Sequence, residues 1–125
     1  MNEVYGFVSV GVDENCDENF LRDRISNAVE HVRFSNKKVG QGYYSNWHVF
    51  SERSQHPDFV TSEILTFLRT KGSLFSNSTI DMHKKVSISL YEDSTSCGLV
   101  VSSELARQIG IHGFDLEVAY YQIHV

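Results

Sequence analysis

Histidine and cysteine are the residue types in this chain that could bind a metal or pair a nucleophile with a base. They lie far apart in the sequence, at Cys16, His31, His48, His56, His83, Cys97, His112 and His124. None forms a His-x-His, His-x-x-x-His or Cys-x-x-Cys pair, so local structure preorganises no metal ligands. The Gly-x-Ser-x-Gly motif of an activated serine is also absent. The sequence therefore predicts no catalytic residue, no metal and no cofactor.

Acidic residues are the second group whose spacing could matter. Asp13, Glu14, Asp17 and Glu18 place four acids within six positions, where an expected strand meets an expected helix. Acids stabilise a helix N-terminus, but four exceed what capping requires. A carboxylate pair for glycoside chemistry is one interpretation. A solvated acidic surface that contacts a basic partner is the interpretation that we favour.

Tyr121 is the aromatic residue that the sequence predicts to be exposed. In the last expected strand it has the same parity as Asp115 and Glu117, so the three side chains should face solvent together. A mixture of exposed tyrosine and acids is typical of a protein-binding surface. The predicted protein-binding residues are Asp13, Glu14, Asp17, Glu18, Glu92, Asp93, Asp115, Glu117 and Tyr121.

Length and charge restrict the class of protein. With 125 residues the chain predicts a single domain over residues 1–125. The net charge of −5 is concentrated at the ends, with seven acids and two bases in residues 1–32 and five acids and one base in residues 86–125. This distribution lacks the basic stripe of a nucleic-acid-binding protein. No apolar run is long enough to cross a membrane and no signal-like segment begins the chain, which predicts a cytoplasmic protein.

Hydrophobic periodicity predicts the elements that position these residues. Alternating residues predict strands at 4–12, 43–52, 86–90, 98–101 and 114–120, and the first of these should be central and covered on both faces. Helical spacing predicts helices at 15–32 and 57–71, and a short one from Ser102 or Ser103 that Gly110 ends as a left-handed cap. Residues 34–42, with Gly40-Gln41-Gly42, are expected to form a loop or a ragged edge of the sheet, and residues 73–83 a loop or one more helical turn.

These elements predict one α+β domain, in which a mainly antiparallel sheet of about five strands has three helices packed mostly on one face. The expected core is the set of apolar residues on the inward faces. It comprises Val8, Val10, Leu21, Ile25, Val29, Trp47, Ile64, Leu68, Ile88, Leu90, Leu105, Leu116 and Val118.

The order of these elements resembles a known family. The residues that carry the resemblance are Asn15 before the first helix, Trp47 in its strand, Ser103-Glu104-Leu105, and the apolar sets at 60–68, 86–90, 98–101 and 116–120. Together they resemble a small bacterial α/β domain of unknown function that occurs in standalone proteins. That domain is similar to immunity proteins of contact-dependent growth inhibition and other polymorphic toxin systems. The resemblance implies an antitoxin-like protein that binds and neutralises a cognate toxin.

Three functions remain as hypotheses. The first is a non-enzymatic immunity protein whose acidic surface occludes a basic toxin domain, such as a nuclease. The second is an enzyme or small-ligand-binding protein with a pocket between helices and sheet, using His48 as acid or base. The third is a homo-oligomeric structural protein, for example a homodimer, whose last strand supplies a pairing edge.

Overall fold

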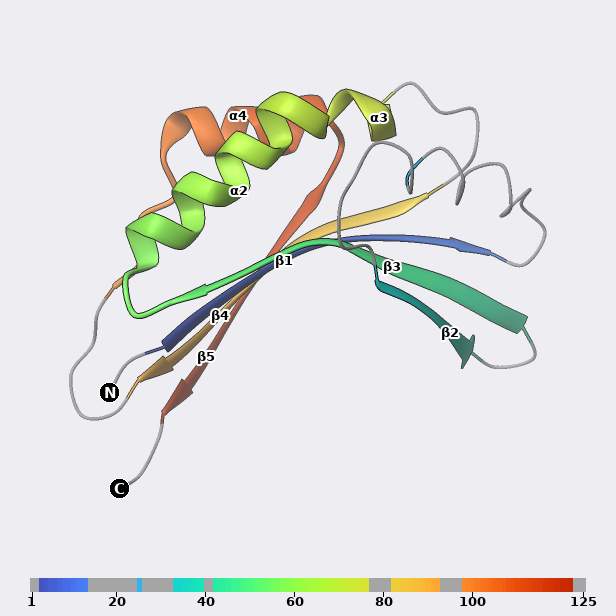
Figure 1. Ribbon diagram of the computed structural model, residues 1–125, viewed down its shortest axis with the longest axis horizontal. Helices are drawn as coiled ribbons and strands as arrows, with labels where there is room; N and C mark the ends of the chain where they lie inside the picture. Colours follow the sequence, from blue (N-terminus) through green and yellow to red (C-terminus); the bar gives the residue numbers. More distant parts are fainter. Residues whose placement is uncertain are drawn as a thin grey trace.

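A five-stranded sheet in the order β2-β3-β1-β4-β5 is the framework of the computed structural model (Figure 1). The model describes residues 3–13, 25, 33–39, 42–76, 82–92 and 98–122. The strands are β1 (Glu3–Asp13), β2 (Arg33–Val39), β3 (Gly42–Ser54), β4 (His83–Glu92) and β5 (Asp115–Gln122). The helices are α2 (Pro57–Lys71), α3 (Ser73–Ser76) and α4 (Ser103–Ile111), and all three lie on the same face of the sheet (Figure 1).

The sheet is mixed. β1 is central, as predicted, and pairs antiparallel with both β3 and β4, while β2 pairs antiparallel with β3. β5 pairs parallel with β4, because α4 lies between the two strands in the sequence and carries the chain back to the same end of the sheet. The predicted small α+β domain is confirmed, and the parallel pair at its C-terminal edge is a feature that the strand pattern did not predict.

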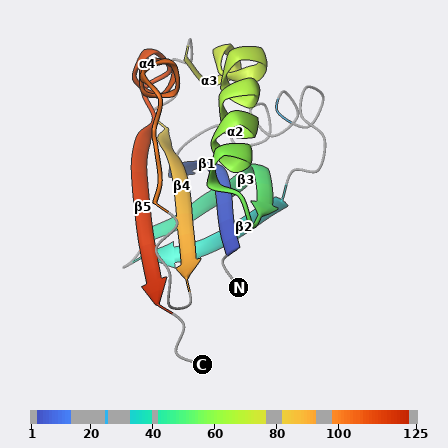
Figure 2. The ribbon, with the colours of Figure 1, turned by 90° about the vertical axis from the view of Figure 1, so that its left-hand side faces the viewer.

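The sequence predicts that β1 is covered on both sides, and the described helices cover one of them. Even-numbered residues Val4, Gly6 and Val8 are buried on the side of α2, whereas Tyr5 and Phe7 are half-buried on the other side. None of the helices that the model describes packs on that second face (Figure 2). Tyr5 and Phe7 therefore mark the face of the sheet on which none of the described helices packs.

β3 contains a β-bulge that aligns its two halves with the core. Val8 pairs with Phe50 and Ser9 pairs with His48, so Val49 has no counterpart on β1. The extra residue resets the alternation, so that Trp47 opposite Val10 and Phe50 opposite Val8 both face the helix side of the sheet, where the Phe50 ring meets that of Phe67 at 5.1 Å.

The helices begin and end largely where the sequence predicts. α2 starts at Pro57, and Val60, Ile64, Phe67 and Leu68 form its buried stripe. The Ser102 hydroxyl caps α4 by accepting a hydrogen bond from the Leu105 amide at 3.1 Å. The left-handed residue after α4 is Gly113, with φ of 71°, and not Gly110, which lies inside the helix. The Phe114 amide then donates to the Ile109 carbonyl at 2.9 Å, which completes a Schellman ending.

Two further assignments are decided by the structure. Residues 33–39 form β2, an edge strand of the sheet, and residue 42 begins β3, which agrees with the expected edge and not with the loop. Residues 98–101 form no strand and lead directly into α4. In the range 73–83, residues 73–76 form the single turn of α3.

The core lies between α2, α4 and the helix-facing side of the sheet. Nine of the predicted core residues are buried, namely Val8, Val10, Ile25, Trp47, Ile64, Leu68, Ile88, Leu90 and Leu105. Leu21, Val29 and the predicted helix at 15–32 lie outside the described residues, apart from helical Ile25.

Leu116 and Val118 do not belong to the core, contrary to the prediction. They are 40% and 46% exposed, although their register partners Val86 and Ile88 are buried. The reason is geometric, because α4 packs chiefly against α2 and buries Leu105 and Ile109 there. Beyond its beginning, the helix-facing side of β5 is therefore not covered by any of the described helices.

Candidate functional site

The side of the sheet opposite the helices, which we call the open face, carries the candidate site. Alternation along the strands places its residues, since odd positions of β1 and β4 point away from the buried even positions. The residues used below are Glu3, Tyr5, Phe7, His48, Arg53, Lys85, Ser89, Tyr91, Asp115, Glu117 and Tyr121.

Aromatic rings form a continuous row across three neighbouring strands of the open face. The ring of Tyr5 on β1 meets that of Tyr91 on β4 edge-on, with centroids 5.4 Å apart. Tyr91 then stacks on Tyr121 of β5, with centroids 4.8 Å apart and an angle of 14° between the planes. Phe7 and His48 contact each other edge-on at 5.5 Å and extend the row toward β3. The open face thus presents flat apolar rings with polar rims.

One end of the row is fixed by a small polar network. The Tyr5 hydroxyl donates to Glu3 Oε2 at 2.8 Å, and Arg53 pairs with Glu3 Oε1 at 3.0 Å. The Arg53 guanidinium also lies 5.5 Å from the centroid of the Tyr5 ring. The hydrogen bond to Glu3 raises the pKa of the Tyr5 hydroxyl above its usual value, so this hydroxyl remains protonated and keeps donating.

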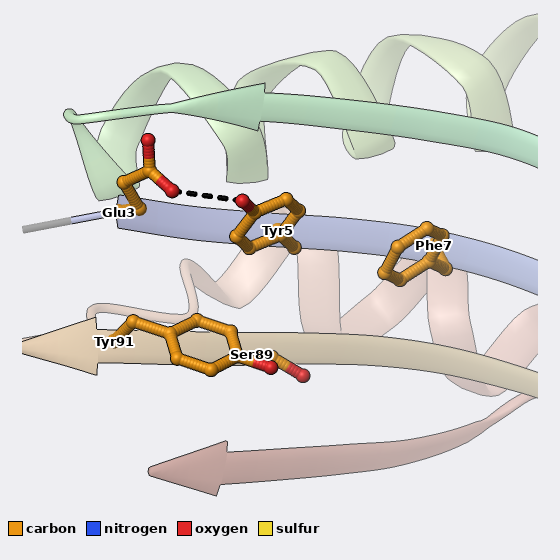
Figure 3. A pocket seen from close by; sticks show the side chains of 5 residues that line it. All are labelled: Glu3, Tyr5, Phe7, Ser89 and Tyr91. Atoms are coloured by element: carbon orange, nitrogen blue, oxygen red, sulfur yellow. Dashed lines mark hydrogen bonds between the residues drawn. The ribbon is translucent and has the colours of Figure 1, made fainter. Parts of the chain in front are cut away.

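A shallow hollow of about 510 Å³ lies along this row. Glu3, Tyr5, Phe7, Ser89 and Tyr91 line it, and Figure 3 shows their side chains rising from β1 and β4 on the side of the sheet away from the helices. The hollow is therefore not the pocket between helices and sheet that the enzyme hypothesis expected. Its lining combines three aromatic rings, three hydroxyls and one carboxylate, which suits binding of an extended or projecting group.

Of the described histidines, His48 lies on the open face, where its ring contacts that of Phe7 edge-on. Within the described ranges no three His, Cys, Asp or Glu side chains gather closely enough to hold a metal ion. The same ranges contain no helix that is long and apolar enough to span a membrane.

The structure brings together three of the predicted site residues. Asp115, Glu117 and Tyr121 are all exposed on the open side of β5, as their shared parity predicted. Lys85 on the neighbouring strand pairs with Glu117 at 3.4 Å. Tyr121 is 49% exposed, so it offers an aromatic surface at the edge of the sheet.

Glu92 is a correction, because its side chain is only 1% exposed. It continues the alternation of Val86, Ile88 and Leu90 and so points to the helix-facing side of β4, away from the open face. The sequence analysis ended the predicted strand at residue 90 and placed Glu92 among the protein-binding residues, whereas Glu92 is the last residue of β4. Glu14, Asp17, Glu18, Asp93 and the side chain of Asp13 lie outside the described residues.

The described part of the chain is electrically balanced. It contains nine acidic and nine basic residues, namely Glu3, Asp13, Glu52, Asp58, Glu63, Glu92, Glu104, Asp115 and Glu117 against Arg33, Lys37, Lys38, Arg53, Arg69, Lys71, Lys84, Lys85 and Arg107. The net charge of −5 therefore comes entirely from the remaining residues, which include Glu14, Asp17 and Glu18. On the open face, Arg53 and Lys85 offset Glu3 and Glu117.

Sequence interpretation missed Tyr5, Tyr91 and Arg53 as parts of the site. A signal for Tyr91 was present, since it shares its parity with Ser87 and Ser89 and not with Val86, Ile88 and Leu90. The contact between Tyr5 and Arg53 depends on the pairing of β1 with β3, which the sequence alone does not specify.

Comparison with known proteins adds no evidence about the site. No family model, no curated protein and no solved structure matches this chain.

Proposed function

We propose that this protein is a non-enzymatic protein-binding domain that contacts its partner with the open face. The observation that carries the proposal is the row of Tyr5, Tyr91 and Tyr121, which spans three strands and ends in a half-exposed ring. Tyrosine buries a large area on binding at a small cost in side-chain entropy, and it is enriched at the centres of protein interfaces.

The rings of the aromatic row are already held in place, which supports binding without rearrangement of these side chains. Stacking holds Tyr121 against Tyr91, and the polar network of Glu3 and Arg53 holds Tyr5. Rings that are already held lose little freedom when a partner covers them, which favours affinity. The balanced charges of the open face suit a partner surface that is itself mixed in charge, with complementary groups for Arg53, Lys85, Asp115 and Glu117.

In its most specific form, the proposal is that the protein acts in the cytoplasm as an immunity protein and neutralises a cognate bacterial toxin. The sequence resemblance described above supports this form. Asp13 is the last residue of β1, and Glu14, Asp17 and Glu18 follow it in the sequence. These four acids would add electrostatic attraction to a basic toxin domain. In this proposal those acids increase the rate of association, and the aromatic row provides most of the affinity.

A co-expression experiment tests the proposal. The protein encoded next to this chain's gene is the predicted toxin, so its expression alone should stop bacterial growth. Co-expression with this protein should restore growth, and the two should purify as a stable complex. A neighbouring protein that is harmless and forms no complex would contradict the immunity function. A stable complex without toxicity would retain the binding function and remove the toxin.

A second experiment distinguishes electrostatic steering by the four acids from close contact by the aromatic row. Lysine at positions 13, 14, 17 and 18 (D13K, E14K, D17K and E18K) should slow association with a basic partner, and the effect should shrink at high salt. Tyr121→Ala should mainly speed dissociation. If the four lysines change neither association nor affinity, those acids are not part of the interface.

A further inference from the structure

Exposed apolar side chains concentrate at the C-terminal edge of the sheet. Of the seven large apolar residues that the described structure shows as exposed, four belong to β5, namely Leu116, Val118, Tyr120 and Tyr121. Val100, at 71% exposed, precedes α4, and Ile111, at 55% exposed, is the last residue of that helix. β5 is the last strand of the sheet, and Figure 2 shows it at the outside of the described elements.

β5 has few of the features that normally prevent strands of different molecules from pairing. It keeps register with β4 over eight consecutive residues without a bulge, and its sequence contains two acids, Asp115 and Glu117, but no lysine and no proline. The opposite edge, β2, differs because its sequence includes Arg33, Lys37 and Lys38. The two edges of the sheet thus differ in charge, and the apolar side chains of β5 are exposed.

We propose that β5 pairs antiparallel with the β5 strand of a second copy, about a two-fold axis at Val118. A two-fold interface requires a surface that is complementary to itself. The sequence Leu116-Glu117-Val118-Ala119-Tyr120 meets this requirement, because its apolar helix-facing residues are placed symmetrically about Val118. The two five-stranded sheets then join into one continuous sheet. This inference does not depend on the proposed toxin partner.

Charge favours this register over an axis at Glu117. With the axis at Val118, Leu116 lies opposite Tyr120, Asp115 lies opposite Tyr121, and Glu117 lies opposite Ala119. No carboxylate then faces another, and the Tyr121 hydroxyl can donate to Asp115 of the second copy. An axis at Glu117 would set two carboxylates against each other, which is destabilising.

The described helices leave room for this pairing. α4 lies above the beginning of β5, and an antiparallel copy would carry its own α4 at the opposite end of the strand pair (Figure 2). The apolar side chains of Leu116, Val118 and Tyr120 from both copies would meet between the two helices. Because the axis is perpendicular to the sheet, both open faces would point to the same side and present two aromatic rows to partners.

Light scattering after size-exclusion chromatography of the full chain tests the pairing. The protein is expected to be a dimer, and Val118→Lys, which sets two like charges at the axis, is expected to make it a monomer. Phe59→Lys is the matched control, since Phe59 is also 46% exposed but lies on α2. A wild-type chain that stays monomeric up to its highest soluble concentration would overturn the proposal. So would a folded Val118→Lys variant that remains dimeric.

Disulfide cross-linking tests the register and does not depend on the lysine variant. In a background with Cys16→Ser and Cys97→Ser, Val118→Cys should form a dimer-linking disulfide under mild oxidation, because residues opposite each other in antiparallel strands have Cα atoms within bonding range. Tyr120→Cys should not, since its two copies would lie about 13 Å apart along the strands. Efficient cross-linking at position 120 and none at 118 would rule out this axis.

Discussion

The phenol rings of Tyr91 and Tyr121 are stacked, with centroids 4.8 Å apart and planes inclined by 14°. The two residues are register partners in the parallel pair of β4 and β5, so the stack follows directly from the strand alignment. Tyr5 meets the other edge of Tyr91, and the ring surface therefore continues from the central strand to the edge of the sheet. This continuity is the basis of the proposed binding function.

The exposure of β5 predicts unequal costs for two leucine substitutions. Leu105 is 1% exposed and Leu116 is 40% exposed. Leu105→Ala should lower the free energy of unfolding by about 2–5 kcal/mol, because it leaves a cavity between α2 and α4. In dilute monomeric protein, Leu116→Ala should lower it by less than about 1 kcal/mol, as expected of surface substitutions. Urea unfolding compares the two, and a larger loss for Leu116→Ala would mean that β5 is covered in solution.

Gly6 sets the distance between β1 and α2. A Cβ atom at this position would lie 2.5 Å from Val60 Cγ1 and 2.9 Å from Ile64 Cδ1. Gly6→Val should therefore push α2 from the sheet and lower the free energy of unfolding by about 1–3 kcal/mol. Ser51→Val adds similar volume at an exposed position of β3 and is the control. Equal stability of the two variants in thermal melts would show that this close approach does not constrain the fold.

Much of the fold could be predicted from the sequence where one local pattern decides the structure. The stripe of Val60, Ile64 and Leu68 predicted α2 because helical spacing and a buried face coincide there. The same logic failed at Leu116 and Val118, since alternation indicates which side a residue faces but not whether another element covers that side. Gly6, an isolated glycine in a strand pattern, was an available sign of close packing.

The candidate site was predicted only in part, for a similar reason. Parity along one strand placed Asp115, Glu117 and Tyr121 together correctly. The row that joins Tyr121 to Tyr91 and Tyr5 depends on strand order and on a parallel pairing, which are long-range properties. Glu92 was misplaced because its charge suggested a loop, whereas the alternation of β4 extends to it.

His112 should make the fold sensitive to mild acid. Burial, together with the nearby charge of Lys84, lowers the pKa of His112 below its usual value of 6.5. The unfolded chain then binds the proton more readily than the folded one, so stability should be constant above this pH and fall as the pH drops below about 6.5. His112→Gln should reduce this fall in urea unfolding between pH 8 and pH 5. An identical fall in both proteins would assign the effect to other groups.

Lys84 should stabilise the junction of α3, α4 and β4. Its ammonium donates to the carbonyl of His112 at 2.6 Å and to that of Phe75 at 3.1 Å. Lys84→Met should lower the free energy of unfolding by about 1–3 kcal/mol, because both carbonyls lose a charged donor. Lys85→Met removes only the exposed pair with Glu117 and should cost less than about 1 kcal/mol. Thermal melts that show equal losses would contradict this role of Lys84.

The affinity of tyrosine variants for the protein encoded by the neighbouring gene tests the central claim most directly. Calorimetric titration should show that Tyr91→Ala and Tyr121→Ala each weaken binding by about 30-fold, as expected when an aromatic anchor worth about 2 kcal/mol is removed. Phe59→Ala, which removes a similarly exposed ring from α2, should leave the affinity unchanged. Unchanged affinity in both tyrosine variants, with a loss in Phe59→Ala, would place the interface on the helical side and contradict the account.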